Sequence, residues 1–501
     1  MCNRITVTVN GRPICGEKGR TISEIIRGEK PCGGHGRCGK CKILARGELS
    51  APSKAEKGLL TDDELAMGVR LACLALALGD CEVKTVNGGG QGQIVTDGAM
   101  PYLKKHPSFE RYGVAIDIGT TTLAARLYGV GGELLAQGSR LNPQQEWGSD
   151  VISRIEAALD GKAPELATVI RQALDAMIIE LADAACIQTK EIDGVVITGN
   201  TVMLSLLTGQ SVVPFSHAPF AAERLFGETV TAHESGISSL SDGTPIYLPP
   251  CISAFVGADT TCAILATELY KGETAMLADI GTNGEMALWH NGKLTVCSTA
   301  AGPAFEGVGI SMGMRGADGA IDKVQIENGQ LNAHVIGDGV PVGICGSGLV
   351  DAASCMLELE IIDESGYLED EAYEISGSVT LTQKDIRMLQ LAKSAVCAGL
   401  ETLADSASLA ISDIPVLSIA GGFGNYLNKE SAARIGLLPK ELAQRSRIVG
   451  NAALAGASML LLNSEMRRRA ETVAKSANVL DLSVSAVFSD HYMIGLMLEE
   501  K

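Results

Sequence analysis

The chain has 501 residues, 46% of them hydrophobic, which leaves room for two or more domains with a large core. A formal net charge of −18 argues against a nucleic-acid partner, because phosphate backbones repel acidic surfaces. We find no signal peptide and no uninterrupted apolar run long enough to cross a bilayer, so we expect a cytoplasmic protein with no membrane partner. Most of the 14 cysteines are scattered singly, as free thiols in a reducing compartment are.

The first 86 residues have the pattern of a small mixed domain. Residues 4–9 alternate like a strand, and Asn10-Gly11 is typical of a hairpin turn. Thr21 can cap a short helix over residues 22–27. Further strands are expected at 41–45, 69–78 and 82–86, and short helical turns over 53–67. This order of elements is consistent with a β-grasp domain.

Three cysteines of this domain lie in the glycine-rich stretch CGGHGRCGKC. Five residues separate Cys32 from Cys38, two separate Cys38 from Cys41, and Cys73 follows farther along the chain. Thiolates at such spacing suit an iron–sulfur cluster, and a [2Fe–2S] centre needs four ligands. The glycines accept backbone angles that let the loop wrap closely around a cluster. Zinc is the alternative metal for such a set.

The C-x5-C-x2-C spacing followed by Leu-Ala-Cys resembles the adrenodoxin-like [2Fe–2S] ferredoxins. The resemblance implies a β-grasp ferredoxin domain over residues 1–86 whose cluster is held by four cysteines: Cys32, Cys38, Cys41 and Cys73. Cys73 is preferred as the fourth ligand because Arg70-Leu71-Ala72 before it matches the context in that family. Cys81 and Cys15 remain alternatives.

A flexible linker is expected over residues 87–111, where glycines and prolines are frequent. After it, YGVAIDIGTTTLAARLY at 112–128 has the pattern of a strand ending in Asp117, a turn and a second strand. The turn, Gly119-Thr120-Thr121-Thr122, offers amides and hydroxyls to phosphate, and the acid suits Mg²⁺ or its waters. A single turn of this kind is also compatible with an ordinary hairpin.

The pattern recurs in MLADIGTNGEMAL at 276–288, where Asp279 precedes the turn Gly281-Thr282-Asn283-Gly284. A third element, an apolar strand at 416–420, leads into Gly421 and Gly422, where a backbone without side chains can lie against adenosine. Two copies of one motif indicate a duplicated domain that binds a nucleotide between its halves.

These three elements, in this order, resemble the phosphate-1, phosphate-2 and adenosine motifs of the superfamily that includes acetate and sugar kinases, the heat-shock chaperone and actin. The resemblance implies two RNase H-like lobes with ATP between them. We therefore expect a multidomain chain of the α+β and α/β classes, with lobe I over 112–271 and lobe II over 272–501, whose C-terminal segment can return to lobe I. Other expectations are helices at 385–403 and 450–462, a late strand at 478–487, and glycine loops at 300–309 and 343–348 that could touch phosphate.

An iron–sulfur domain joined to such an ATPase resembles the reductive activators of corrinoid-dependent enzymes. The resemblance covers nearly the whole chain, including DIGTTT, NPQ, GSDV, DIGTNGE, GICGSGLVDA and AGGFGN. It implies an ATP-hydrolysing activase that transfers an electron from its [2Fe–2S] cluster to an inactive Co(II) corrinoid protein of a methyltransferase system, which regenerates Co(I). We also expect an unidentified low-potential electron donor and a homodimer.

The resemblance assigns roles to residues of this chain. Asp117 and Asp279 position Mg²⁺ and the attacking water. The turns hold phosphate through Gly119, Thr120, Thr121 and Thr122 and through Gly281, Thr282, Asn283 and Gly284. Gly421 and Gly422 pack on the adenosine. Four acids remain open as the general base: Glu146, Asp150, Asp259 and Glu285.

Two other functions share parts of this pattern. The activators of hydroxyacyl-CoA dehydratases use the same ATPase fold, but they are expected to hold a [4Fe–4S] cluster between subunits and to lack the N-terminal domain. The cysteine set from Cys32 to Cys73 argues against them. A small-molecule kinase with a ferredoxin as redox sensor would need a sugar pocket, and the chain has no recognisable sugar-kinase signature.

Overall fold

The computed structural model describes residues 4–9, 12–26, 36, 39, 41–85, 98, 100–423 and 426–501. The hairpin turn Asn10-Gly11, the cysteines Cys32 and Cys38, and linker positions 87–97 and 99 lie outside the described residues. Among the described helices, none combines the length and the apolar character needed to cross a lipid bilayer.

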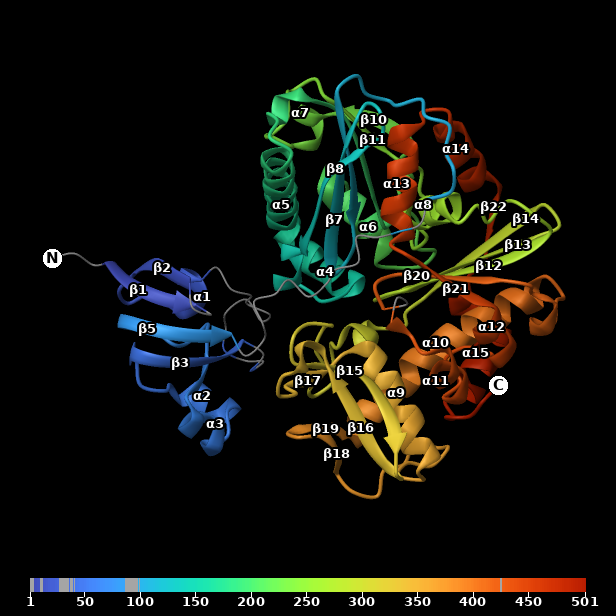
Figure 1. The fold of residues 1–501 in the computed structure, drawn as a ribbon. Coiled ribbons are helices and arrows are strands. Elements are labelled where there is room, and N and C mark those ends of the chain that lie inside the picture. The colour runs from blue at the N-terminus through green and yellow to red at the C-terminus, as the bar shows by residue number, and fades with distance from the viewer. Residues whose placement is uncertain are drawn as a thin grey trace.

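The N-terminal domain, blue in Figure 1, is built on one five-stranded sheet with the order β2-β1-β5-β3-β4. β1 pairs with β2 as an antiparallel hairpin and with β5 in parallel, whereas β3 is antiparallel to both β4 and β5. The elements are β1 (Arg4–Val9), β2 (Arg12–Glu17), α1 (Ile22–Ile25), β3 (Lys42–Leu49), α2 (Lys54–Leu59), α3 (Asp62–Met67), β4 (Val69–Leu71) and β5 (Ala77–Thr85). The predicted mixed domain with a central sheet is therefore present.

The second sheet has the order β10-β11-β9-β6-β7-β8. β6, β7 and β8 form an antiparallel meander, and β9 and then β11 add in parallel on the other side of β6. Its elements and helices are β6 (Tyr112–Ile118), β7 (Thr122–Gly129), β8 (Leu134–Leu141), α4 (Val151–Ala157), α5 (Ala163–Ala184), β9 (Ile192–Gly199), α6 (Thr201–Thr208), β10 (Glu228–Thr231), α7 (Ala232–Ser235), β11 (Pro245–Leu248) and α8 (Ala258–Ala266).

The third sheet, with the order β21-β20-β12-β13-β14-β22, repeats this plan. β12, β13 and β14 form the meander, and β20 and β21 add in parallel beside β12. The duplication predicted from the two motif copies is thus visible in the strand order. The elements are β12 (Thr274–Ile280), β13 (Gly284–His290), β14 (Lys293–Thr299), β20 (Leu417–Ala420), β21 (Ser446–Gly450) and β22 (Ala477–Val479).

The second half also carries two small sheets and most of the remaining helices. The small sheets are β16-β15-β17 and β18-β19, formed by β15 (Ala320–Glu327), β16 (Gln330–Val335), β17 (Gly343–Ile344), β18 (Ala372–Ser376) and β19 (Val379–Thr382). The helices are α9 (Gly346–Glu358), α10 (Gln383–Ser406), α11 (Lys429–Arg434), α12 (Lys440–Arg445), α13 (Ala452–Leu462), α14 (Met466–Ser476) and α15 (Ala486–Ile494). The helices predicted over 385–403 and 450–462 correspond to α10 and α13.

Helices α8 and α13 pack against each other between the two large sheets (Figure 1). α13 contacts β6 and β9 of the second sheet, and α8 contacts β12 and β13 of the third. One buried apolar cluster includes Val196 and Leu277 from the two sheets together with Cys262 and Leu460 from the two helices. Helix α13, which comes late in the chain, therefore packs on the sheet of the first lobe, and its contact with α8 joins the cores of the two lobes.

The crossing of α8 and α13 depends on Gly456, where an added Cβ would lie 2.0 Å from the carbonyl oxygen of Cys262. We expect Gly456→Ala to lower the free energy of unfolding by about 1–3 kcal/mol, because backbones this close cannot admit a methyl group without moving apart. Urea unfolding measures the loss. Gly243→Ala is the control, since a Cβ there would meet nothing within 4 Å. Equal stability of the two variants would contradict this account of the crossing.

The strand predicted over residues 478–487 is wrong beyond its first residues. Only Ala477–Val479 forms a strand, β22, which pairs in parallel with β14. Asp481 and Ser485 then begin helical turns, and Oγ of Ser485 accepts a hydrogen bond from the amide of Phe488 (3.2 Å). Such local side-chain bonds stabilise helix starts at the expense of extended backbone, although the apolar alternation is that of a strand.

Candidate nucleotide and cluster sites

The two Asp-Gly-Thr turns occupy equivalent places in the two large sheets. The first joins β6 to β7, with Thr122 opening β7, and the second joins β12 to β13, with Gly284 opening β13. The amide of Gly119 donates to the carbonyl of Thr122 (2.9 Å), and the amide of Gly281 donates to the carbonyl of Asn283 (3.0 Å). Both predicted strand–turn–strand motifs are present.

The two turns meet across the lobes. Oγ1 of Thr121 and Oγ1 of Thr282 are 3.2 Å apart. Both residues are buried, and so is Thr120, whose Oγ1 accepts a hydrogen bond from Nδ2 of Asn200 (3.1 Å). Because hydroxyls from both lobes lie at one point, a single anion there can bind both turns at once.

Three side chains hold the first turn from one side by donating to three successive carbonyls. The donors are Nδ2 of Asn142 to Gly119 (2.9 Å), Nη2 of Arg154 to Thr120, and Nε2 of Gln145 to Thr121 (2.9 Å). In a planar trans peptide the carbonyl and the next amide point in opposite directions. The three amides that follow these carbonyls therefore point away from the supporting side chains. This is an orientation suited to binding an anion.

Three aspartates form a largely buried acidic group. Burial, together with the charges of Asp259 and Asp279, raises the pKa of Asp117 to about 8. Burial and the charge of Asp259 raise the pKa of Asp279 to about 7, and burial raises that of Asp259 to about 6. All three residues keep some accessible surface. A divalent cation would offset this repulsion.

Two of the four general-base candidates belong to this acidic group. Asp259 lies in the first turn of α8, and Glu285 is directly opposite Asp279 in the β12–β13 register. Burial and the charges of both aspartates raise the pKa of Glu285 well above its usual range. Asp150 instead caps α4 by accepting from a backbone amide (2.8 Å), and Glu146 is exposed. The structure therefore favours Asp259 and Glu285 over the other two.

Gly421, in the third glycine element, packs on Asp279, the aspartate that precedes the second turn. Gly421 has a φ of +95°, and an added Cβ would lie 2.8 Å from Oδ1 of Asp279. Both the backbone angle and the lack of space require glycine there. At Gly422 a Cβ would meet none of the described atoms within 4 Å, so among these residues the position leaves room beside the backbone.

Sequence reasoning did not identify three residues of this site: Arg154, Glu306 and Asn451. Nδ2 of Asn451, at the start of α13, donates to Oδ2 of Asp117 (3.0 Å). Glu306 accepts hydrogen bonds from the hydroxyls of Thr121 and Thr282. Glu306 lies in the glycine loop over 300–309, for which the sequence allowed either a contact with phosphate or a structural turn, but no local pattern marks its carboxylate. Its partners are brought to it only by the tertiary structure.

In the N-terminal domain, the structure brings Cys41 and Cys73 together. Their sulfur atoms are 3.2 Å apart without a disulfide, and the amide of Ala72 donates to the carbonyl of Cys41 (2.8 Å). Two thiolates bound about 2.3 Å from one tetrahedral metal ion lie roughly 3.8 Å apart, somewhat more than this separation, so a small movement would let both bind one ion. Cys81 lies in β5, between β1 and β3, and burial raises the pKa of its thiol.

The loop that carries Cys73 is anchored by a buried ion pair. Glu56 accepts from Nε and Nη2 of Arg70 (2.9 and 3.0 Å) and from the amide of Leu71 (3.2 Å). Gly36 and Gly39, in the cysteine loop, have φ values of +63° and +66°, which glycine adopts without strain. Gly36 and Gly39 thus adopt backbone angles that other residues resist, as expected for glycines of this loop.

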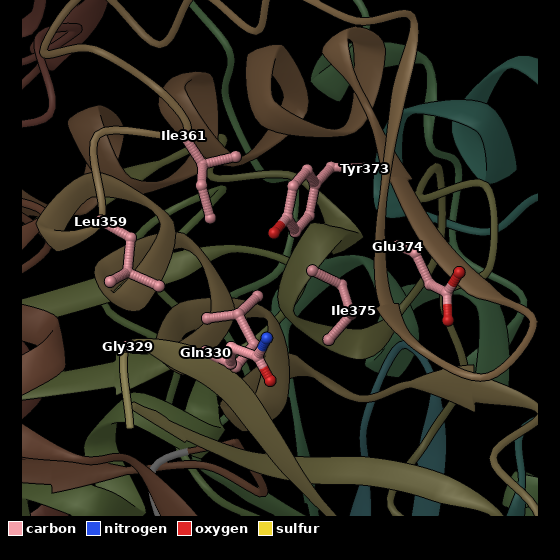
Figure 2. A pocket seen from close by; sticks show the side chains of 8 residues that line it. Gly329, Gln330, Leu359, Ile361, Tyr373, Glu374 and Ile375 are labelled. Carbon is pink, nitrogen blue, oxygen red and sulfur yellow. The ribbon is translucent and has the colours of Figure 1, made fainter. Parts of the chain in front are cut away.

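A separate cavity of about 450 Å³ lies among the small sheets of the second half (Figure 2). It is lined by the start of β16, the residues after α9 and part of β18, including Leu359, Ile361 and Tyr373. None of its lining residues belongs to the two turns or to the glycine element. We therefore assign it no part in binding the nucleotide.

Family models match the chain from residue 112 to residue 501. Residues 112–272 match the middle region of RACo, and residues 273–501 match the C-terminal domain of RACo, the ASKHA domain. Together with the duplicated sheets and paired turns, this match defines the protein as an actin-like ATPase, in agreement with the predicted fold class.

Comparison with individual relatives identifies the family. The corrinoid activation enzyme RamQ of Eubacterium limosum is 35% identical over 77% of this chain and 70% of its own length. The [Co(II) methylated amine-specific corrinoid protein] reductase of Methanosarcina barkeri is 26% identical over 77% of this chain and 76% of its own. A solved reductive activator for corrinoid, iron–sulfur protein superposes with a TM-score of 0.72 and 27% identity, over 99% of this chain and 98% of that chain. The chain belongs to the family of reductive activators of corrinoid proteins.

Proposed function

We propose that this protein uses ATP to drive an electron from a [2Fe–2S] cluster to the Co(II) form of a corrinoid protein, which regenerates Co(I). The observation that carries the proposal is the presence of two sites in one chain. The paired hydroxyls of Thr121 and Thr282 lie at the ATPase turns, and the paired sulfurs of Cys41 and Cys73 lie in the N-terminal domain.

The nucleotide is assigned to the space between the two turns and the third glycine element. The amides and hydroxyls of the turns hold phosphate, and Gly421 and Gly422 pack on the adenosine. Asp117 and Asp279 hold Mg²⁺ and orient the attacking water. The described residues contain no group of three or more His, Cys, Asp or Glu side chains that could hold a metal ion together. Mg²⁺ suits such a site, because it is usually held by one or two carboxylates with phosphate and water.

The cluster is assigned to Cys32, Cys38, Cys41 and Cys73 within residues 1–86. When bound, it supplies one electron at low potential. The short distance between the sulfur atoms of Cys41 and Cys73 supports these two residues as ligands, and the Glu56–Arg70 pair holds the loop of Cys73 in place. Residues 87–111 serve as the linker to lobe I (112–271) and lobe II (272–501).

ATP is needed because Co(I) is a stronger reductant than such a cluster. For one electron, each ~59 mV of unfavourable potential costs tenfold in the equilibrium constant. ATP can help only if it favours one arrangement of the lobes that binds the Co(II) protein in a form easier to reduce. Thr121 belongs to one lobe and Thr282 to the other, so a phosphate bound by both hydroxyls would fix the two lobes relative to each other. Hydrolysis to ADP and phosphate would return the lobes to their first arrangement.

The remaining partners follow from the same proposal. They are a corrinoid protein of a methyltransferase system, a low-potential electron donor and a second copy of this chain. On helix α15, Met493 and Ile494 are 65% and 58% exposed and would offer apolar surface to such a second copy. The buried free thiols, among them Cys262 and Cys397, suit the reducing cytoplasm.

The test is anaerobic reduction of a Co(II) corrinoid protein from a methyltransferase system, followed at the Co(I) absorption band. We expect Co(I) only when both the reduced protein and ATP are present. A non-hydrolysable ATP analogue separates the effect of nucleotide binding from that of turnover. Co(I) formation without nucleotide, or failure with several corrinoid proteins despite an intact [2Fe–2S] spectrum, would contradict the proposal. Phosphorylation of an added sugar would instead indicate a kinase.

A further inference from the structure

Glu306 joins the two Asp-Gly-Thr turns through hydrogen bonds to one threonine of each. It ends the 3-10 turn Pro303–Glu306, and its carboxylate accepts from Oγ1 of Thr121 in the first turn. Both of its oxygens also lie 3.1 Å from Oγ1 of Thr282 in the second turn. One carboxylate therefore bridges hydroxyls that come from different lobes.

A nucleotide phosphate would need the same two donors. A threonine hydroxyl has one hydrogen, so it can donate to Glu306 or to phosphate, but not fully to both. Two anions at one point would also repel each other at short range. Resting on the assignment of ATP to this site, we propose that Glu306 is a carboxylate latch that takes the place of a nucleotide phosphate between the turns and must be displaced when ATP binds.

The charges around the latch suit the exchange of one anion for another. Arg154 is buried beneath the first turn, where it donates to Gln144 and to backbone carbonyls. Burial lowers the pKa of its guanidinium to about 10, and the charges of Asp150 and Glu306 oppose this shift. Within the described residues, no carboxylate forms an ion pair with Arg154 at 4 Å or less. Its positive charge acts on the turn with either the carboxylate or a phosphate in place.

The loop around Glu306 connects the phosphate turns to the glycine element. Gly302 and Gly307 flank the 3-10 turn with φ values of +79° and +76°. The ring of Phe305 stacks on that of Phe423 with 4.5 Å between centroids. Phe423 follows Gly421 and Gly422, so the residue next to Glu306 along the chain contacts the predicted adenosine segment.

Removal of the latch should strengthen the binding of ATP but not of AMP, whose single phosphate does not extend to the turns. If the latch is open about one-tenth of the time, Glu306→Ala tightens ATP binding about tenfold, because the apparent dissociation constant scales inversely with the competent fraction. Glu306→Gln keeps the shape of the side chain but loses its charge. We expect its affinity for ATP to lie between that of Glu306→Ala and that of the wild type. Glu327→Gln, at an exposed position on β15, is the matched control.

Isothermal titration of each full-length variant with ATP–Mg²⁺ and with AMP measures these effects. A tenfold gain for ATP with less than a twofold change for AMP would support the latch. Unchanged or weaker ATP binding in both Glu306 variants would overturn it, as would an equal gain for AMP. A hundredfold loss of ATP hydrolysis at unchanged affinity would also overturn it, because Glu306 would then act in the chemical step. If the wild type itself binds no ATP, the assignment of the nucleotide site fails instead.

Discussion

Asp279→Asn is expected to lower ATP-dependent Co(I) formation at least about a hundredfold without making the protein less stable. The carboxylate lies at the second turn, and in the proposed function it holds Mg²⁺, the cation that would stabilise the negative charge developing on phosphate during hydrolysis. Burial and the charge of Asp259 already raise the pKa of Asp279 to about 7. Ionisation of this carboxylate therefore opposes folding at neutral pH, and the neutral amide relieves that repulsion.

The rate of Co(I) formation and thermal unfolding without nucleotide measure the two halves of this prediction. Asp413→Asn is the control, because Asp413 is an exposed aspartate of the same half of the chain. The iron–sulfur spectrum should be unchanged in both variants. Full activity of Asp279→Asn would mean that Asp279 is not a functional residue of the nucleotide site. A lower unfolding midpoint together with the loss of activity would mean that the residue serves the fold rather than the chemistry.

Cys73→Ser is expected to abolish the cluster and with it all electron transfer, whereas Cys81→Ser should retain both. The sulfur of Cys73 lies 3.2 Å from that of Cys41, and the loop that carries it is held by the buried Glu56–Arg70 pair. Cys81 is instead enclosed in the central strand β5, where burial raises the pKa of its thiol and disfavours the thiolate that a metal needs. A matched pair of cysteine variants thus separates the two candidates for the fourth ligand.

Iron content, the visible spectrum and electron paramagnetic resonance of the reduced protein give the readout. ATP binding should be unaffected in Cys73→Ser, because the nucleotide residues lie in the other domain. A cluster retained in Cys73→Ser but lost in Cys81→Ser would reverse the ligand assignment. Zinc in place of iron in the anaerobically purified wild type would mean that the site is structural and that the proposed electron route is wrong.

The motif-bearing strands could be predicted from sequence because their signals are local. Asp117 and Asp279 each follow an apolar strand and precede a glycine-threonine turn, and the structure has both turns where the pattern predicts them. The segment after residue 477 shows where a local pattern misleads. Its apolar alternation predicts a strand, but the hydrogen bond from the amide of Phe488 to Ser485 favours a helix instead.

The residues that complete the site could not be found in this way. Glu306, Arg154 and Asn451 carry no motif, and each acts on a turn or aspartate that is distant along the chain. The sequence also left the choice among four general bases open, and packing shows that two of them, Asp259 and Glu285, belong to the largely buried acidic group.

The sequence by itself determined the class of the protein and the two Asp-Gly-Thr turns, and it predicted the set of four cysteines. Each of these patterns consists mainly of residues that are close together along the chain. The tertiary structure decided which residues meet. It placed Thr121 3.2 Å from Thr282, brought Cys73 rather than the strand residue Cys81 beside Cys41, and set one carboxylate between the lobes. The physical reason is that hydrogen bonds and charge interactions act over a few ångströms, and only the packing of two sheets around α8 and α13 brings such distant residues within that range.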